Sequence, residues 1–355
     1  MTSRPGPSLG SIGERAYLHR LKARVPSTAG VVVGLGDDAA AVEAGPLVLV
    51  TTDTLVEDVH FRREQSPPRL LGRKALSVNL SDLAAMGGVG RYAVVSLCLP
   101  PALPADWVDA LYDGLLERAA EAGVAIVGGN LAATGGGIVI DVTLLGEGED
   151  GRLLRRSGAR PGDCIAVTGT LGAAAAGVQL LADGARLDDE LRLASGGRWE
   201  GSPEPVIVGC LRAQLDPQPP LGLARAIGER GLVHAAMDLS DGLSSDLPEM
   251  CAESGVRAVV DAGALPIDPG AAVVARARGR EPRSLALHGG EDYQLLLAVG
   301  AEELHELVAL ARVWSIEVSV VGAFLEGEPG VWLRDGSGER RLEPRGHDHF
   351  AAAGR

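Results

Sequence analysis

The stretch MDLSDGLSSD, residues 237–246, places two aspartates three positions apart with a serine between them. Apolar residues precede it and a helix-forming run follows, which is typical of a turn between a strand and a helix. Asp238 and Asp241 repel each other at this spacing unless a cation lies among them. Mg²⁺ suits these oxygen ligands, because one or two carboxylates together with substrate phosphates usually hold it. The alternative is that Ser240 or Asp241 caps the helix starting near Leu243, although one cap needs only one such residue.

Length and charge limit the classes of function. A chain of 355 residues can form two domains with separate cores. Its net charge of −14 argues against nucleic acid, which is bound through Lys and Arg, but a divalent cation can still bridge carboxylates to a phosphorylated small molecule. The chain has no apolar run of the ~18 residues that a membrane span needs and no signal-peptide core. The four cysteines follow no metal-binding spacing. We therefore expect a cytoplasmic protein that binds neither nucleic acid nor membrane.

Apolar runs of strand character alternate with amphipathic segments along the whole chain. This pattern predicts an α/β (α+β) fold, in which a mixed sheet in each domain is covered by helices on one face. The polar, glycine-rich segment 146–163 is the expected junction, which gives domains at 1–148 and 149–355. The predicted helices are 8–24, 68–86, 105–123, 171–184, 203–214, 221–229 and 242–254.

A second group of acidic residues follows the first apolar runs. Asp37 and Asp38 come directly after VVVGLG, whose glycines allow close approach of a ligand, although a plain Gly-Asp turn is the commoner meaning. Thr51, Thr52 and Asp53 lie in the run 46–54, where we expect the strand to end and a site to be built. A capped strand terminus explains these three residues equally well.

The helix at 68–86 carries a polar stripe in an otherwise apolar sequence. Asn79 and Asp82 are three positions apart and therefore adjacent on the helix surface, on the stripe that also holds Lys74. A solvated face is the usual explanation for such charges. The apolar residues from Ala75 to Met86 favour a functional cluster beside buried surface.

Three glycine-containing turns add candidates. VGGN, residues 127–130, is predicted to end a strand with an amide. TGTLGAAAAG, residues 168–177, has the pattern of a strand, a turn and a helix, but it is not a Walker A loop. The start of this helix could bind phosphate, although Thr170 capping the helix is the simpler interpretation. HGGEDY, residues 288–293, places two carboxylates before an apolar strand, and one of them can be a turn residue.

Together these motifs resemble the thiamine-monophosphate kinases, a family within the superfamily of aminoimidazole-ribonucleotide synthetase. The resemblance extends almost end to end, and eight motifs occur in the family's order. They are GDDAA (36–40), TTDTLVEDVHF (51–61), GRKALSVNLSDLAAMGG (72–88), VGGN (127–130), RSGARPGD (156–163), TGTLG (168–172), MDLSDGL (237–243) and GGEDY (289–293).

The resemblance implies a homodimer of two-domain chains that phosphorylates thiamine monophosphate with ATP, around several Mg²⁺ ions. It implies nucleotide binding and dimerisation by the N-terminal domain and a contribution of the C-terminal domain to the substrate and metal site. The implied Mg²⁺ ligands are Asp38, Thr51, Thr52, Asp53, Asp82, Asn130, Asp238 and Asp241. The implied nucleotide contacts are Tyr112, Gly129, Asn130, Arg156 and Ser240, and the implied thiamine contacts are His60, Glu291 and His347.

Two positions depart from the family's pattern. His347 in RGHDHF stands where the family commonly has a larger aromatic residue, and Ala173 follows TGTLG where relatives have an acidic residue. Within the superfamily, a selenide water dikinase would need a reactive cysteine before Cys98, and a hydrogenase-maturation factor would need a C-terminal cysteine. Another ATP-dependent enzyme of the superfamily, or a nucleotide-binding module without catalysis, remains the alternative.

Overall fold

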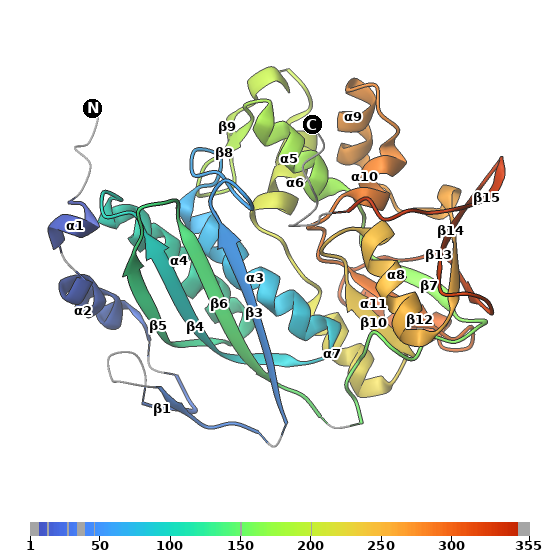
Figure 1. Ribbon diagram of the computed structural model, residues 1–355, viewed down its shortest axis with the longest axis horizontal. Helices are drawn as coiled ribbons and strands as arrows, with labels where there is room; N and C mark the ends of the chain where they lie inside the picture. Colours follow the sequence, from blue (N-terminus) through green and yellow to red (C-terminus); the bar gives the residue numbers. More distant parts are fainter. Residues whose placement is uncertain are drawn as a thin grey trace. The chain divides into compact units, whose positions relative to one another are not determined.

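The computed structural model describes residues 7–12, 14–26, 28–33, 40–45, 47–149, 151–199 and 201–346. Two compact units divide the chain: Met1–Leu83 with Gly88–Glu149, and Ala84–Gly87 with Asp150–Arg355. Each unit has its own sheet, and both sheets contain parallel and antiparallel neighbours (Figure 1). The fold is therefore α/β with a mixed sheet in each unit, as the sequence predicts.

The first unit is built on a four-stranded sheet in the order β3-β6-β4-β5. β3 pairs antiparallel with β6 from Val48 opposite Glu147 to Val56 opposite Val139. β4 and β5 are parallel, and α4 connects them. The elements are α1 Leu9–Ile12, α2 Glu14–Arg24, β1 Val31–Val33, β2 Ala41–Val42, β3 Val48–Val56, α3 Pro68–Ala85, β4 Val89–Leu99, α4 Ala105–Ala122, β5 Ala125–Ala133 and β6 Val139–Glu147.

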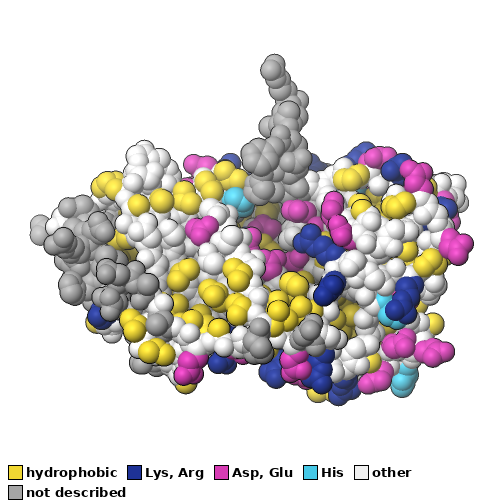
Figure 2. Space-filling view, turned by 60° about the horizontal axis from the view of Figure 1, so that its bottom comes forward, with side chains coloured by type: hydrophobic (Ala, Val, Ile, Leu, Met, Phe, Trp, Pro, Cys, Tyr) yellow, Lys and Arg dark blue, Asp and Glu magenta, His cyan; other side chains and the backbone are white. Residues whose placement is uncertain are grey.

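Helices cover one face of this sheet. Ile140, Val142 and Leu144 of β6 are fully buried on that face, while the intervening residues of β6 are partly exposed on the other. The second face is partly closed by a small cluster in which Val31 and Val42 pack on Tyr92. In Figure 2, hydrophobic side chains outnumber charged ones on the left-hand part of the surface, which belongs to the first unit.

The second unit has a seven-stranded sheet in the order β10-β12-β7-β13-β11-β14-β15, with helices on both faces. Alternate residues of one strand enter two different cores: Ile165 and Val167 of β7 pack with α8, whereas Ala166 packs with α7 and α11. Covering by helices on one face, as predicted, is therefore wrong for this unit. Its strands have nearly continuous apolar runs, which is the pattern of a sheet buried on both sides.

The helices of the second unit are α5 Ala173–Ala182, α6 Glu204–Leu215, α7 Leu221–Arg230, α8 Leu243–Ser254, α9 Pro269–Ala277, α10 Pro282–His288 and α11 Leu304–Val313, with short 3₁₀ turns at Gly197–Trp199 and Ala262–Ala264. Its strands are β7 Cys164–Thr168, β8 Arg186–Leu187, β9 Leu193–Ser195, β10 Ala235–Asp238, β11 Arg257–Asp261, β12 Leu295–Val299, β13 Val318–Leu325, β14 Gly330–Asp335 and β15 Gly338–Arg341.

Two strands of the first unit run further than predicted. β3 continues to Val56 and β5 continues to Ala133. Thr51–Asp53 and Asn130 are therefore interior residues of paired strands rather than strand ends. The pairing partner sets the length of each strand, because β6 offers register positions along the whole of β3.

In the first unit, α3 and α4 cross at two glycines. A Cβ atom at Gly114 would overlap the carbonyl oxygen of Arg69, and one at Gly72 would overlap that of Leu111. The two helix backbones therefore approach more closely than side chains would permit.

We expect Gly114→Ala to lower the thermal unfolding midpoint by several degrees, since overpacking costs about 1–3 kcal/mol. The control is Gly209→Ala on α6, where a Cβ atom meets nothing within 4 Å. That variant should unfold at an unchanged or higher temperature, because alanine favours a helix by up to about 1 kcal/mol. Equal unfolding midpoints for the two variants would contradict a close α3–α4 crossing.

Candidate active site

In the second unit, the turn between β10 and α8 carries Asp238, Ser240 and Asp241. Asp238 ends the strand and is only 4% exposed. Neither Ser240 nor Asp241 caps the helix, so that alternative is wrong: Gly242 occupies the cap position without a side-chain hydrogen bond. Asp246 instead reaches back from the first turn of α8, and its carboxylate accepts hydrogen bonds from the backbone N–H groups of Asp241 (3.2 Å) and Gly242 (3.0 Å).

The three carboxylates of this turn lie close enough to affect one another. The pKa of Asp246 is raised to about 8, mainly by burial and then by the charges of Asp241 and Asp238, while the two backbone hydrogen bonds act in the opposite direction. Such a concentration of negative charge favours a cation. The donors are all hard oxygens, and Mg²⁺ needs only one or two carboxylates when phosphates and water complete its shell. Asp238 and Asp241 therefore fit the ion that the sequence predicts.

A second segment, Gly289–Tyr293, holds the acidic turn in place. The backbone N–H of Glu291 donates to the carbonyl of Ser240 (2.7 Å), and that of Tyr293 donates to Leu239 (2.9 Å). Glu291 itself has a φ of 68°, a left-handed conformation that non-glycine residues rarely adopt. Its carboxylate accepts a hydrogen bond from Gln214 Nε2 at 2.6 Å. The structure thus brings Glu291 next to the turn that carries Ser240 and Asp241.

The neighbouring Asp292 has a structural role at the start of α5. Its carboxylate accepts hydrogen bonds from Gly172 N (2.7 Å) and Ala174 N (3.4 Å). Thr170 is not the cap, as the sequence suggested, because its hydroxyl donates to Asp268 (3.1 Å). These helix N–H groups are therefore already satisfied by a carboxylate and are not bare groups available to phosphate. Burial raises the pKa of Asp292 to about 7.

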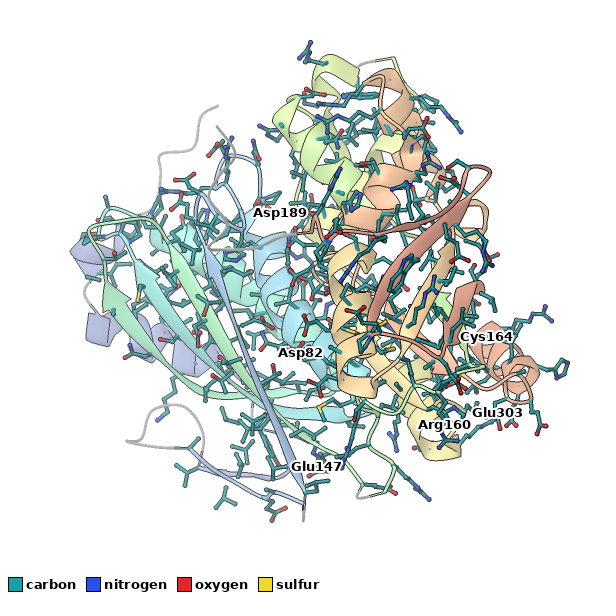
Figure 3. The ribbon with its side chains drawn as sticks, turned by 45° about the vertical axis from the view of Figure 1, so that its right-hand side comes forward. Asp82, Glu147, Arg160, Cys164, Asp189 and Glu303 are labelled. Atoms are coloured by element: carbon teal, nitrogen blue, oxygen red, sulfur yellow. The ribbon has the colours of Figure 1, made fainter. Side chains whose placement is uncertain are left out.

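In the first unit, the side chain of Thr51 donates a hydrogen bond to Asp82, which joins β3 to α3. Figure 3 shows Asp82 on α3. Asp53 lies two residues after Thr51 and two before the buried Leu55, so all three face the helices. The structure therefore brings Thr51, Asp53 and Asp82 to one side of the sheet.

Thr52 faces the opposite side of the same strand. Its hydroxyl lies 3.0 Å from that of Thr143, and Thr54 donates to Asp141 at 2.6 Å.

Asn130 of β5 faces the same side as Thr52. Ser96 of β4 is in register with both Asp141 and Asn130. A Cβ at Gly128 would contact Val94, so Asn130, two residues later, faces this same side. Thr52 and Asn130 are thus separated by the sheet from Thr51, Asp53 and Asp82.

The other nucleotide and thiamine candidates have different surroundings. Tyr112 is buried, which raises its pKa to about 12. Gly129 is needed for close strand pairing, since a Cβ there would overlap the carbonyl of Val95.

His60 is a candidate thiamine contact, and its Nδ1 accepts a hydrogen bond from the backbone N–H of Val56 (3.0 Å). Arg156, a candidate nucleotide contact, is exposed. Asp38 and His347 lie outside the described residues.

Within the described ranges, no three His, Cys, Asp and Glu side chains come together as a group able to hold a metal ion. Three acidic residues that lie beside the candidates have no role predicted from the sequence: Asp141, Asp246 and Asp292. Asp246 and Asp292 lie within the motifs MDLSDGLSSD and HGGEDY, and Asp141 interrupts an apolar strand run.

Known proteins match both units. Residues 36–147 match the family described as AIR synthase related protein, N-terminal domain, and residues 160–332 match its C-terminal domain. A thiamine-monophosphate kinase from Mycobacterium tuberculosis is 39% identical over 292 residues, which are 82% of this chain and 81% of that relative. The chain belongs to the thiamine-monophosphate kinase family. It is therefore a kinase.

Solved structures of the family agree with this assignment. A thiamine-monophosphate kinase from Stenotrophomonas maltophilia is 34% identical, with a TM-score of 0.77 over 89% of this chain and 94% of that one. AaThiL complexed with AMPPCP and TMP is 30% identical, with a TM-score of 0.73 over 97% and 99%. None of the helices in the described ranges combines the length and the apolar composition that a membrane span requires.

The raised pKa of Asp292 predicts a pH dependence of stability. An unfolded aspartate has a pKa near 4, so between about pH 4 and pH 7 the folded state holds a proton that the unfolded state has lost. The free energy of unfolding therefore falls as the pH rises through this window, by up to ~1.4 kcal/mol per pH unit from this group.

The test compares urea unfolding of wild type and Asp292→Asn from pH 4.5 to pH 7. Asparagine keeps one acceptor for the α5 cap but cannot titrate, so the variant should lose this part of the slope. The control is Asp106→Asn, an exposed aspartate of α4, which should keep it. Identical slopes in wild type and Asp292→Asn would show that Asp292 is ionised throughout.

Proposed function

We propose that the protein transfers the γ-phosphoryl group of ATP to the phosphate of thiamine monophosphate, giving thiamine diphosphate and ADP. The proposal rests on family membership together with the buried acidic turn at Asp238–Asp246. AaThiL, which matches 97% of this chain, was solved with AMPPCP and TMP. The remaining site residues taken from the sequence, including Asp38 and His347, stay predictions.

The reaction needs alignment of two anions more than it needs a base. An oxygen of the thiamine monophosphate phosphate is already ionised, and it attacks the γ-phosphorus while the bond from that phosphorus to the β–γ bridging oxygen breaks. The electron pair of that bond leaves with ADP, so no proton has to be removed. Catalysis then depends on positioning and on neutralising charge. When bound, Mg²⁺ supplies that neutralisation on the polyphosphate.

The residues proposed to bind metal and phosphate come from both units of the chain. Asp238 and Asp241 would hold metal at the turn of the second unit, and Asp246 keeps the turn's backbone fixed. Thr51, Asp53 and Asp82 present oxygens on one side of the first unit's sheet, where Thr51 orients the carboxylate of Asp82. Arg156 is exposed and carries a permanent charge that suits ATP phosphates.

Asp238→Asn and Asp82→Asn test this proposal in a coupled assay for ATP-dependent formation of thiamine diphosphate. Each should lower kcat by at least about 10²-fold, the scale for removing one electrostatic group from such a site. The control Asp106→Asn should retain activity. Excess EDTA should abolish wild-type activity, and added Mg²⁺ should restore it.

Unfolding in EDTA separates catalysis from folding. Removing one charge from a repelling group should leave the metal-free protein at least as stable. Strong destabilisation of both variants would assign Asp238 and Asp82 to the fold instead. Wild type with no thiamine diphosphate formation under any metal condition would overturn the function itself.

We also propose that the chain forms a homodimer through the open face of the first unit's sheet. Val50 is 65% exposed and Val48 is 39% exposed on β3, which is an edge strand. Exposed apolar residues on such a strand favour covering by a partner.

Val50→Asp should therefore shift the protein from dimer to monomer in sedimentation velocity. Val313→Asp, a control on α11 where the valine is 77% exposed, should leave the dimer intact. A wild-type monomer at micromolar concentration, or a dimer unaffected by Val50→Asp, would contradict the proposal.

A further inference from the structure

A cavity of about 230 Å³ lies in the second unit, and none of its lining residues is among those assigned above. It is bounded by α10, by β15 and by the segment that follows β15. Four arginines line it: Arg283, Arg340, Arg341 and Arg345. Lys and Arg make up 33 of the 355 residues, so a wall of ten residues would hold about one by chance. This concentration of positive charge is unexpected in a chain with a net charge of −14.

Nearby carboxylates leave hydrogen-bond donors of these arginines unused. The Nε atom of Arg283 lies 3.7 Å from Oε2 of Glu281, and its Nη1 atom lies 3.6 Å from Oδ2 of Asp335. The Nε atom of Arg340 lies 4.0 Å from the same Asp335 oxygen. These distances exceed the 2.7–3.2 Å of a hydrogen bond, so the contacts are electrostatic and do not consume N–H donors. Asp335 instead accepts hydrogen bonds from Ser337, through its backbone N–H (2.9 Å) and its hydroxyl (2.5 Å).

The side chains of the remaining two arginines, Arg341 and Arg345, make different contacts. The guanidinium carbon of Arg341 lies 5.8 Å from the centre of the Trp332 ring, within the range of a cation–π contact. The guanidinium of Arg345 pairs with no residue in the part of the chain that the structure describes. Glu343 adds a further carboxylate to the wall. Glu281, Asp335 and Glu343 therefore oppose four arginines, and the balance stays positive.

His288 adds a polar ring to the same wall. Its Nδ1 lies 2.8 Å from the hydroxyl of Ser244, which itself accepts the backbone N–H of Arg345 (3.4 Å). The Ser244 hydroxyl has two acceptor lone pairs and one hydrogen, so it can either donate to Nδ1 or accept from it. Burial lowers the pKa of His288, and the charges of Arg345 and Arg340 lower it further.

From the cavity's size and donors we infer a binding site for a small phosphate-type oxyanion. Guanidinium groups bind phosphate oxygens through paired N–H donors, and Arg283, Arg340 and Arg345 surround one volume. That volume of about 230 Å³ lies below the 300–1,000 Å³ of typical ligand pockets, so it admits a phosphate or diphosphate group but not a nucleotide. A cationic thiamine ring does not suit it.

The site borders the acidic turn without sharing its residues. Beyond Arg345, the backbone N–H of Gly346 donates to the hydroxyl of Ser245 (3.0 Å), and Gly346 packs against the carbonyl of Asp241. The wall of the cavity therefore continues directly into a contact with the turn. Anion binding here goes beyond the proposed kinase reaction and does not depend on it.

Calorimetry on the full chain tests the site, with inorganic phosphate as the probe. Constant ionic strength and EDTA remove nonspecific and metal-bridged binding. Wild type should bind phosphate saturably, with one site per chain. Arg340→Gln and Arg345→Gln should each weaken binding at least tenfold, whereas Arg345→Lys should retain part of it. The control Arg312→Gln, at an exposed arginine of α11, should bind as wild type does.

Further titrations identify the source of the anion. Pyrophosphate and glycerol 3-phosphate, a small organic phosphate without a cationic ring, are compared with phosphate in wild type and in Arg345→Gln. Arg345-dependent binding of phosphate indicates a free anion, and Arg345-dependent binding of the organic phosphate alone indicates a phosphorylated metabolite. Absence of any saturable binding through the millimolar range would overturn the inference. So would binding that survives both glutamine variants, or that Arg312→Gln weakens equally. Melting of each variant at the wild-type temperature confirms that folding is unchanged.

Discussion

Backbone hydrogen bonds between two distant segments of the second unit fix its acidic turn. Leu239 and Ser240 accept N–H groups from Tyr293 and Glu291, so the chain near residue 240 is clamped to the chain near residue 291. Carboxylates that repel each other would otherwise move apart. Asp246 completes the restraint by binding the turn's own N–H groups. The position of Asp238 and Asp241 is thus set by backbone hydrogen bonds and by the Asp246 side chain.

Much of this arrangement could be predicted from the sequence, because the decisive motifs are local. A strand-turn-helix at 237–246 follows from its apolar run and its helix-forming residues, and α8 begins one residue from the predicted start. The order of eight short motifs was enough to indicate the family. What was missed depends on contacts between distant residues. Capping of α5 by Asp292 joins positions 120 residues apart, and no spacing rule connects Asp292 with Gly172.

The predicted ends of the strands were wrong for a related reason. Polar residues at Thr51–Asp53 look like the end of a strand, but β6 continues the pairing to Val56. Helices on both faces of the second sheet were also missed, although the uninterrupted apolar runs of β7 and β12 carried that signal. The cavity of arginines had no signal, since Arg283 and Arg345 come from separate segments whose proximity only folding creates.

The alternation along β3 limits how this chain can change during evolution. Thr51 and Asp53 face the helices while Thr52 faces the other side, and both sets make defined contacts. Point substitutions affect one set at a time. A deletion or insertion of one residue would exchange the two sets, because neighbouring strand positions point in opposite directions. The number of residues between Val48 and Val56 is therefore constrained more tightly than the identity of any one of them.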